Sequence, residues 1–147
     1  MGFRTRCTIL ALPALAAALA AGGSPPSEPQ QEPRYDGASV VDIDMIVAEV
    51  REVAKGNPLP GVHLMARPES ARADSEPVDV YVAPVAFLKM MEFTFHARDR
   101  LEVKGSKVKM GNVFVILSSE VRRGDSTLYV RDRNGEPVWK ALLKDGS

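Results

Sequence analysis

Cysteine is almost absent from this 147-residue sequence, in which Cys7 is the single example. Because Cys7 lies in a stretch with the layout of a removable leader, the remaining chain contains none. A disulfide, a thiolate metal site and a cysteine nucleophile are thereby excluded. Aromatic residues are also few, at 6% of the chain. They provide little material for the stacking platforms that single-stranded nucleic acids require.

The N-terminal stretch "MGFRTRCTILALPALAAALAAGG" carries Arg4 and Arg6, then an uncharged apolar run, then small residues. This three-part layout is that of a secretory signal peptide, and the run is too short to span a bilayer comfortably. We therefore expect cleavage after residues 1–20, no membrane span in the mature chain, and a periplasmic or secreted protein. Gly22 stands where a lipoprotein carries its lipidated cysteine, so no lipid anchor is expected.

Neither positive nor negative charge is in excess, since the chain has 19 basic and 19 acidic residues. Loss of the leader removes Arg4 and Arg6 and no acidic residue, which leaves 17 basic against 19 acidic groups. A slightly acidic chain does not favour general binding to nucleic acid or anionic lipid, because both need a concentrated basic surface. Nucleic acid is therefore not the expected partner.

The segment "GGSPPSEPQQEPRYD" has four prolines and little to bury. This composition is typical of an extended tether, so residues 21–38 are predicted to be a disordered linker. The folded domain is expected over residues 39–143.

Alternating apolar residues predict strands at "VHLMARP" and "VDVYVAP", and Pro84 ends the second. "VAFLKMMEF" has the spacing of one or two helical turns, while the apolar run in "VFVILSSEV" predicts a strand covered on both faces. "STLYVRD" reads as another strand, and "PVWKALL" as a final short strand or helical cap. "VDIDMIVAEVREVAKG" fits both a helix and a strand.

The stretch "DRLEVKGSKV" begins as a half-buried strand, with Leu101 and Val103 on one face. Beyond Gly105 the apolar positions are Val108 and Met110, so the alternation changes from odd to even. One extra residue accounts for this change, and we expect a β-bulge at Gly105 that bends the strand. Short strands with bulge and turn glycines indicate a small β-barrel.

Five sequence pieces follow one another in a characteristic order: "GVHLMA", "VDVYVAPVAFL", "DRLEVKGSKV", "EVRRGDSTLYVRD" and "NGEPVW". This order resembles that of bacterial exported OB-fold proteins of uncharacterised function, including the bacterial OB-fold (BOF) family. Ala83, Ala86 and Arg98 depart from that pattern. The resemblance implies that Ile46 to Val53 forms the first barrel strand. The expected fold is all-β: a five-stranded OB-like barrel with a short helix between strands three and four.

His63 and Met65 lie two residues apart on one predicted strand and so share a face. Imidazole and thioether groups are the ligands that Cu(I) and Ag(I) prefer, which makes a periplasmic soft-metal carrier one alternative function. The competing interpretation, which we favour, is that methionines fill gaps in the barrel and His63 lies on its outer face. No cofactor is therefore expected.

His96, Asp99 and Ser118 or Ser119 contain the residue types of a hydrolytic triad, but no nucleophile elbow frames either serine. "RDRNGE" lacks the acidic ligands of a calcium loop and is better explained as an Asn-Gly turn. Enzymatic activity is therefore not expected.

Basic and aromatic side chains recur along the predicted sheet, on the face with which OB-folds bind their ligands. The candidate ligand-binding residues are Tyr81, Lys104, Lys107, Arg122, Arg131 and Trp139. The sequence thus predicts a non-enzymatic exported binding or stress-related module whose partner is an unknown small ligand or an envelope protein. An oligonucleotide-binding protein is the other alternative.

Overall fold

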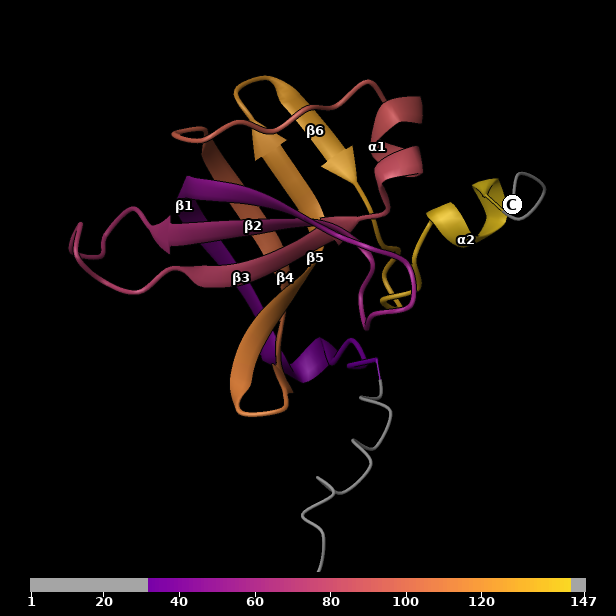
Figure 1. Cartoon of the computed structure of the whole chain (residues 1–147), viewed down its shortest axis with the longest axis horizontal. Coiled ribbons are helices and arrows are strands. Elements are labelled where there is room, and N and C mark those ends of the chain that lie inside the picture. The colour runs from indigo at the N-terminus through magenta and orange to yellow at the C-terminus, as the bar shows by residue number, and fades with distance from the viewer. Residues whose placement is uncertain (1–31, 144–147) are drawn as a thin grey trace, which may run out of the picture.

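The computed structural model describes residues 32–143 (Figure 1). The predicted leader and residues 21–31 of the predicted linker lie outside them. The described strands and helices are, in chain order, η1 (Gly37–Ser39), β1 (Val40–Val53), β2 (Gly61–Pro68), β3 (Val78–Ala83), α1 (Val85–Met90), β4 (Arg100–Met110), β5 (Val113–Arg123), β6 (Ser126–Tyr129) and α2 (Trp139–Leu142). None of the helices in this part of the chain is long and apolar enough to cross a membrane.

Five strands close into a barrel. The sheet runs in the order β3-β2-β1-β4-β5-β6, and a parallel pairing of β3 with β5 joins its two sides. Every other strand pair is antiparallel. The helix α1 follows Pro84 and lies between β3 and β4 in the chain. The predicted five-stranded OB-like barrel with one short helix after its third strand is therefore confirmed.

The segment that fitted both a helix and a strand is the strand β1, 14 residues long. Its first half pairs with β4, from Val40 opposite Ser106 onward, and its second half pairs with β2. Between the two halves the register skips Ala48, so that β1 carries one extra residue there. Such a bulge bends a strand and lets it serve two neighbours, which is what barrel closure requires.

Gly105 does lie at a register break, but the extra residue belongs to the other strand. Lys104 pairs with Glu120 and Gly105 pairs with Ser118, so Ser119 of β5 is the unpaired residue. The prediction of a bulge in β4 was wrong in this respect. Gly105 is needed for a different reason: a Cβ atom built there would lie 2.3 Å from the Leu117 carbonyl oxygen. The two backbones approach too closely for any side chain.

The core fills the barrel with side chains from every strand and from α1. Its fully buried members are Met45, Val47, Leu59, Leu64, Val80, Val82, Phe87, Val103, Val115, Ile116, Leu117 and Leu128, among others. Three residues of β5, from Val115 to Leu117, are buried in succession. This agrees with the prediction that the strand is covered on both faces.

The segment before β1 is attached to the barrel. The Ser106 hydroxyl donates to the Asp36 carbonyl oxygen at 2.9 Å and accepts from the Asp36 backbone N–H at 2.9 Å. The Ser39 hydroxyl oxygen lies 2.9 Å from the Ser106 hydroxyl oxygen. The Tyr35 ring packs over Gly135. Residues 35–39 are therefore held against the barrel and the 130–138 segment by these contacts.

Ser106→Ala should lower the free energy of unfolding by about 1–2 kcal/mol, because it removes the hydrogen bonds that hold Asp36 and Ser39 of the N-terminal segment to β4. Ser106 is fully buried and bonded to both Asp36 and Ser39. Urea unfolding measures the change. Ser126→Ala, at an exposed strand end, is the control. Equal midpoints for the two variants would contradict the anchoring role of Ser106.

Candidate ligand-binding site

The bulge at Ser119 positions the segment that carries Arg131. The Ser119 carbonyl oxygen, displaced from the β4–β5 ladder, accepts from the backbone N–H groups of Val130 at 2.9 Å and Arg131 at 3.2 Å. Val138 returns to donate to the Val130 carbonyl at 3.1 Å. Residues 130–138 thus form a small hairpin against β5, and Gly135 in its turn adopts a φ of 79°.

Arg131 lies between two aromatic rings inside this hairpin. Its guanidinium carbon is 5.4 Å from the centroid of Trp139 and 6.0 Å from that of Tyr35. Only 9% of the residue is exposed. Both distances are within the range in which a cation is attracted to an aromatic face.

The guanidinium of Arg131 has few hydrogen-bond acceptors. Nη1 donates to the Gly135 carbonyl oxygen at 2.9 Å, while the buried Nε has no acceptor among residues 32–143. No carboxylate of the described chain forms an ion pair with it. Burial lowers the pKa of Arg131, and the fields of Tyr81 and Glu32 oppose that shift. An arginine stays charged in proteins, so this is a buried positive charge without a paired anion.

Arg131 opens onto a surface cleft of about 600 Å³, which we call the Arg131 cleft. The ring of Tyr129, which is largely exposed, forms part of its wall. Its charged lining residues are Lys104, Glu120, Arg131, Asp132 and Arg133. Three cationic and two anionic side chains leave an excess of one positive charge.

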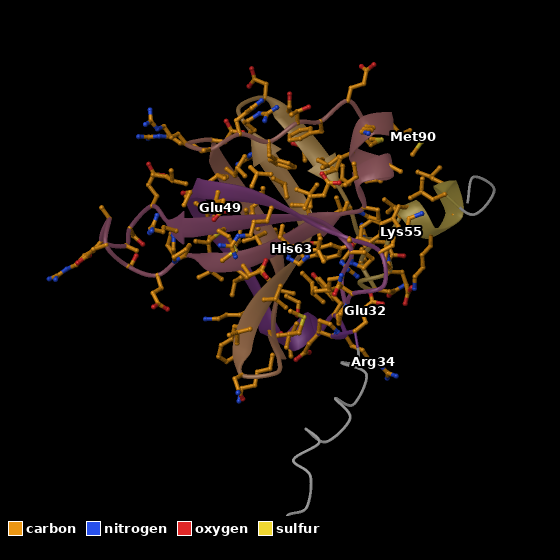
Figure 2. The ribbon with its side chains drawn as sticks, in the orientation of Figure 1. Glu32, Arg34, Glu49, Lys55, His63 and Met90 are labelled. Atoms are coloured by element: carbon orange, nitrogen blue, oxygen red, sulfur yellow. The ribbon has the colours of Figure 1, made fainter. Side chains whose placement is uncertain are left out.

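His63 lies beside Tyr81, and both of its ring nitrogens have partners. Nδ1 lies 2.8 Å from the Asp79 carboxylate and Nε2 lies 2.7 Å from the Leu59 carbonyl oxygen. Both partners are acceptors, so both ring nitrogens carry protons and the imidazole is cationic. Burial lowers the pKa of His63, but the hydrogen bonds to Asp79 and Leu59 and the Asp79 charge together raise it by more. Figure 2 shows His63 among the central strands.

Tyr81 connects His63 to Trp139. Its ring centroid is 5.0 Å from that of His63 and 6.1 Å from that of Trp139, the latter edge-on. The Tyr81 hydroxyl donates to the Pro60 carbonyl oxygen at 2.8 Å, and burial raises the pKa of the phenol, which stays neutral. These contacts link five side chains into one row, in which two aromatic rings separate the two basic groups: His63, Tyr81, Trp139, Arg131 and Tyr35.

The soft-metal hypothesis required a free nitrogen on His63. Both nitrogens are engaged as donors, so neither offers a lone pair to Cu(I) or Ag(I). Met65 is partly buried, two residues further along β2.

The triad residue types are not brought together. Asp99 accepts from the His96 backbone N–H at 2.8 Å and pairs with Arg123 at 3.1 Å. Ser118 is fully buried and donates to the Tyr81 carbonyl oxygen. Ser119 donates to the Lys104 carbonyl oxygen.

Four of the six predicted ligand-binding residues converge. Tyr81, Arg131 and Trp139 belong to the row of rings, and Lys104 lines the Arg131 cleft. Lys107 instead lies over the Phe114 ring, 5.0 Å from its centroid, and Arg122 pairs with Glu102 across the β4–β5 ladder.

Sequence reasoning missed Tyr35 and the bulged Ser119. The signal for Tyr35 was present: it is the only aromatic residue between residues 21 and 80. A large ring at the end of a proline-rich segment indicates that the segment packs against something. Ser119 gave no comparable signal, because a bulge depends on the pairing of two strands.

The fold is that of a small OB-like β-barrel protein with a lateral surface cleft. A model of the MamS/MamX magnetosome protein family matches residues 40–128. This is more than half of the chain, which therefore belongs to the MamS/MamX magnetosome protein family. The matched span includes most of the barrel but ends before Arg131 and Trp139. No match was found among curated proteins or among solved structures.

Proposed function

We propose that this protein is an exported, non-enzymatic binding module that holds a ligand bearing an oxyanion, a phosphate or carboxylate group, on Arg131. The observation that carries the proposal is the buried guanidinium of Arg131, which has one protein acceptor and no paired carboxylate among residues 32–143. A buried charge destabilises a fold unless it is paired. An oxyanion in the cleft would supply that pairing.

The chemistry of arginine supports an oxyanion in particular. Its planar fork of N–H groups matches two oxygens of a carboxylate or phosphate. Lys104 lines the same cleft and would add a second positive charge. Two charge-assisted hydrogen bonds would contribute about 3–6 kcal/mol before the cost of association, so we expect weak binding.

We also propose where this protein acts and to which proteins it is related. Action in the periplasm or outside the cell is supported by the leader-like layout of residues 1–20. The family name associates the MamS/MamX proteins with magnetosomes, and we expect the same setting for this chain. Kinship with exported bacterial OB-fold proteins is part of the proposal, supported by the sequence pieces between residues 61 and 139.

Trp139 provides the test, because it is the only tryptophan of the chain and it contacts Arg131. Titration of the protein with inorganic phosphate and with succinate should change the Trp139 fluorescence and saturate. Arg131→Met should weaken binding of the active anion at least about tenfold, since it removes the charge and the fork. Arg122→Met, which removes a surface arginine already paired with Glu102, should bind as the parent does.

Stability separates a binding role of Arg131 from a structural one. Arg131→Met should keep the free energy of unfolding within about 1 kcal/mol, because loss of an unpaired buried charge offsets loss of the Gly135 hydrogen bond. A parent protein that responds to neither anion, or a variant that binds normally, would refute the oxyanion site. A large loss of stability in Arg131→Met would assign the arginine to the fold instead.

A further inference from the structure

The end of the β4–β5 hairpin extends beyond the barrel. β4 pairs with β1 only as far as Ser106, and β5 pairs with β3 only from Val115 onward. Residues 107–114 therefore pair with no strand outside this hairpin, from Lys107 opposite Ile116 to Met110 opposite Val113. Figure 1 shows this hairpin projecting away from the other strands. We call residues 107–114 the hairpin tip.

The hairpin tip is apolar at its end. Val113 is 58% exposed and Phe114 is 46% exposed, immediately after the turn at Gly111 and Asn112. Turns and exposed strand ends are ordinarily polar. These two side chains are not among the buried core residues, so stability of the barrel does not account for them.

Two lysine side chains lie near the exposed ring of Phe114. The ammonium nitrogens of Lys107 and Lys109 lie 5.0 Å and 5.8 Å from the centroid of Phe114. The sequence contains no acidic residue between Glu102 and Glu120. The tip thus has a local positive charge, although the chain without residues 1–20 is slightly acidic overall.

An exposed aromatic ring flanked by two lysines suits the surface of a membrane. Apolar side chains enter the boundary between headgroups and acyl chains, while the long lysine stems carry their charges back to the phosphates. Clusters of basic residues favour anionic lipids over neutral ones. Val108 and Met110 of the tip pack against the core, whereas Val113 and Phe114 beyond the turn are exposed and can enter this layer without unfolding of the barrel.

We propose that the hairpin tip docks the barrel onto a lipid surface that carries anionic headgroups, with Val113 and Phe114 inserted and Lys107 and Lys109 on the phosphates. This surface is separate from the Arg131 cleft and would hold the protein at a membrane without a spanning segment. The proposal does not depend on the oxyanion site, and the Arg131→Met variant should bind vesicles as the parent does.

Co-sedimentation with vesicles tests the docking. The chain from Ala21 onward is used, because the apolar leader would itself bind lipid, and it retains every strand of the barrel. Vesicles of phosphatidylcholine mixed with phosphatidylglycerol should retain the protein, and vesicles of phosphatidylcholine alone should retain it about thirtyfold less, as expected for two lysines near an anionic surface. Val113→Ser with Phe114→Ser should reduce retention at least about tenfold. Lys107→Glu with Lys109→Glu should abolish the preference for the anionic vesicles.

A matched control is available on α1 and the residue after it. Met90 and Met91 are 48% and 47% exposed, close to the exposure of Phe114, and Met90→Ser with Met91→Ser should leave retention unchanged. Circular dichroism checks that each variant remains folded. No retention of the parent, equal retention on both vesicle types, or an equal loss in the control would overturn the proposal. A dimer that Phe114→Ser dissociates, without vesicle binding, would overturn it in favour of self-association.

Discussion

Gly105→Ala should lower the free energy of unfolding by about 3 kcal/mol, at the upper end of what overpacking a close contact costs. The added Cβ would lie 2.3 Å from the Leu117 carbonyl oxygen and 2.7 Å from the Ser118 Cα atom. Both are backbone atoms, so no side chain can rotate away, and β4 and β5 must separate where the barrel closes. Urea unfolding followed by Trp139 fluorescence measures the loss.

Gly37→Ala is the matched control for this substitution. Gly37 lies in η1, and a Cβ atom built there meets nothing within 4 Å. We expect its unfolding midpoint to equal that of the parent or to rise slightly, because alanine restricts the unfolded chain. If Gly105→Ala unfolds at the same urea concentration as Gly37→Ala, the two strands do not approach each other as described.

His63→Ala should have the second large effect and lower the free energy of unfolding by about 2–3 kcal/mol. His63 is 4% exposed, and its removal leaves a cavity between β2, β3 and the Leu59 loop. The Leu59 carbonyl would lose its donor, and Asp79 would lose its positive partner. The same unfolding measurement applies. His96→Ala removes the other, exposed histidine and should change the midpoint little.

The pH dependence of stability identifies the charge on His63. Its pKa is raised in the folded protein above the ordinary value of 6.5, so the folded state holds the proton more tightly than the unfolded state. The stabilisation is fully present below pH 6.5 and is lost as the pH rises through the folded pKa. The free energy of unfolding of the parent should therefore fall with pH above that value, and His63→Ala should lack this decline. A parallel decline in both proteins would mean that another group causes it and that folding does not raise the pKa of His63.

The strands that alternate clearly were predictable from local pattern. "VHLMARP" and "VDVYVAP" became β2 and β3, and the helical spacing after Pro84 became α1. β1 was ambiguous because its apolar residues satisfy both periods. Its assignment as a strand depends on β4 and β2, with which it pairs in turn. Only the implied resemblance, not the propensity of its residues, pointed to that outcome.

The candidate site was predictable only in part. Arg131, Trp139 and Tyr81 were singled out by residue type, but nothing local indicated that they meet. Their contact requires the carbonyl of Ser119 to leave the β4–β5 ladder and receive residue 131. Lys107 and Arg122 were chosen on the same grounds but lie elsewhere. Lys107 belongs to the hairpin tip, over the Phe114 ring, and Arg122 forms an ion pair with Glu102.

The sequence by itself determined that the chain lacks cysteine after its leader-like stretch, that it is built from short strands, and that Gly105 marks an irregular point in one of them. These are consequences of composition and of the period of apolar residues, which any short window reveals. The tertiary structure alone decided that Ser119 is the bulged residue, that His63 carries its charge between Asp79 and Leu59, and that Tyr35 covers Arg131. Each of these depends on how strands pair and pack against one another, and that pairing is set by closure of the whole barrel rather than by the pattern within a short window.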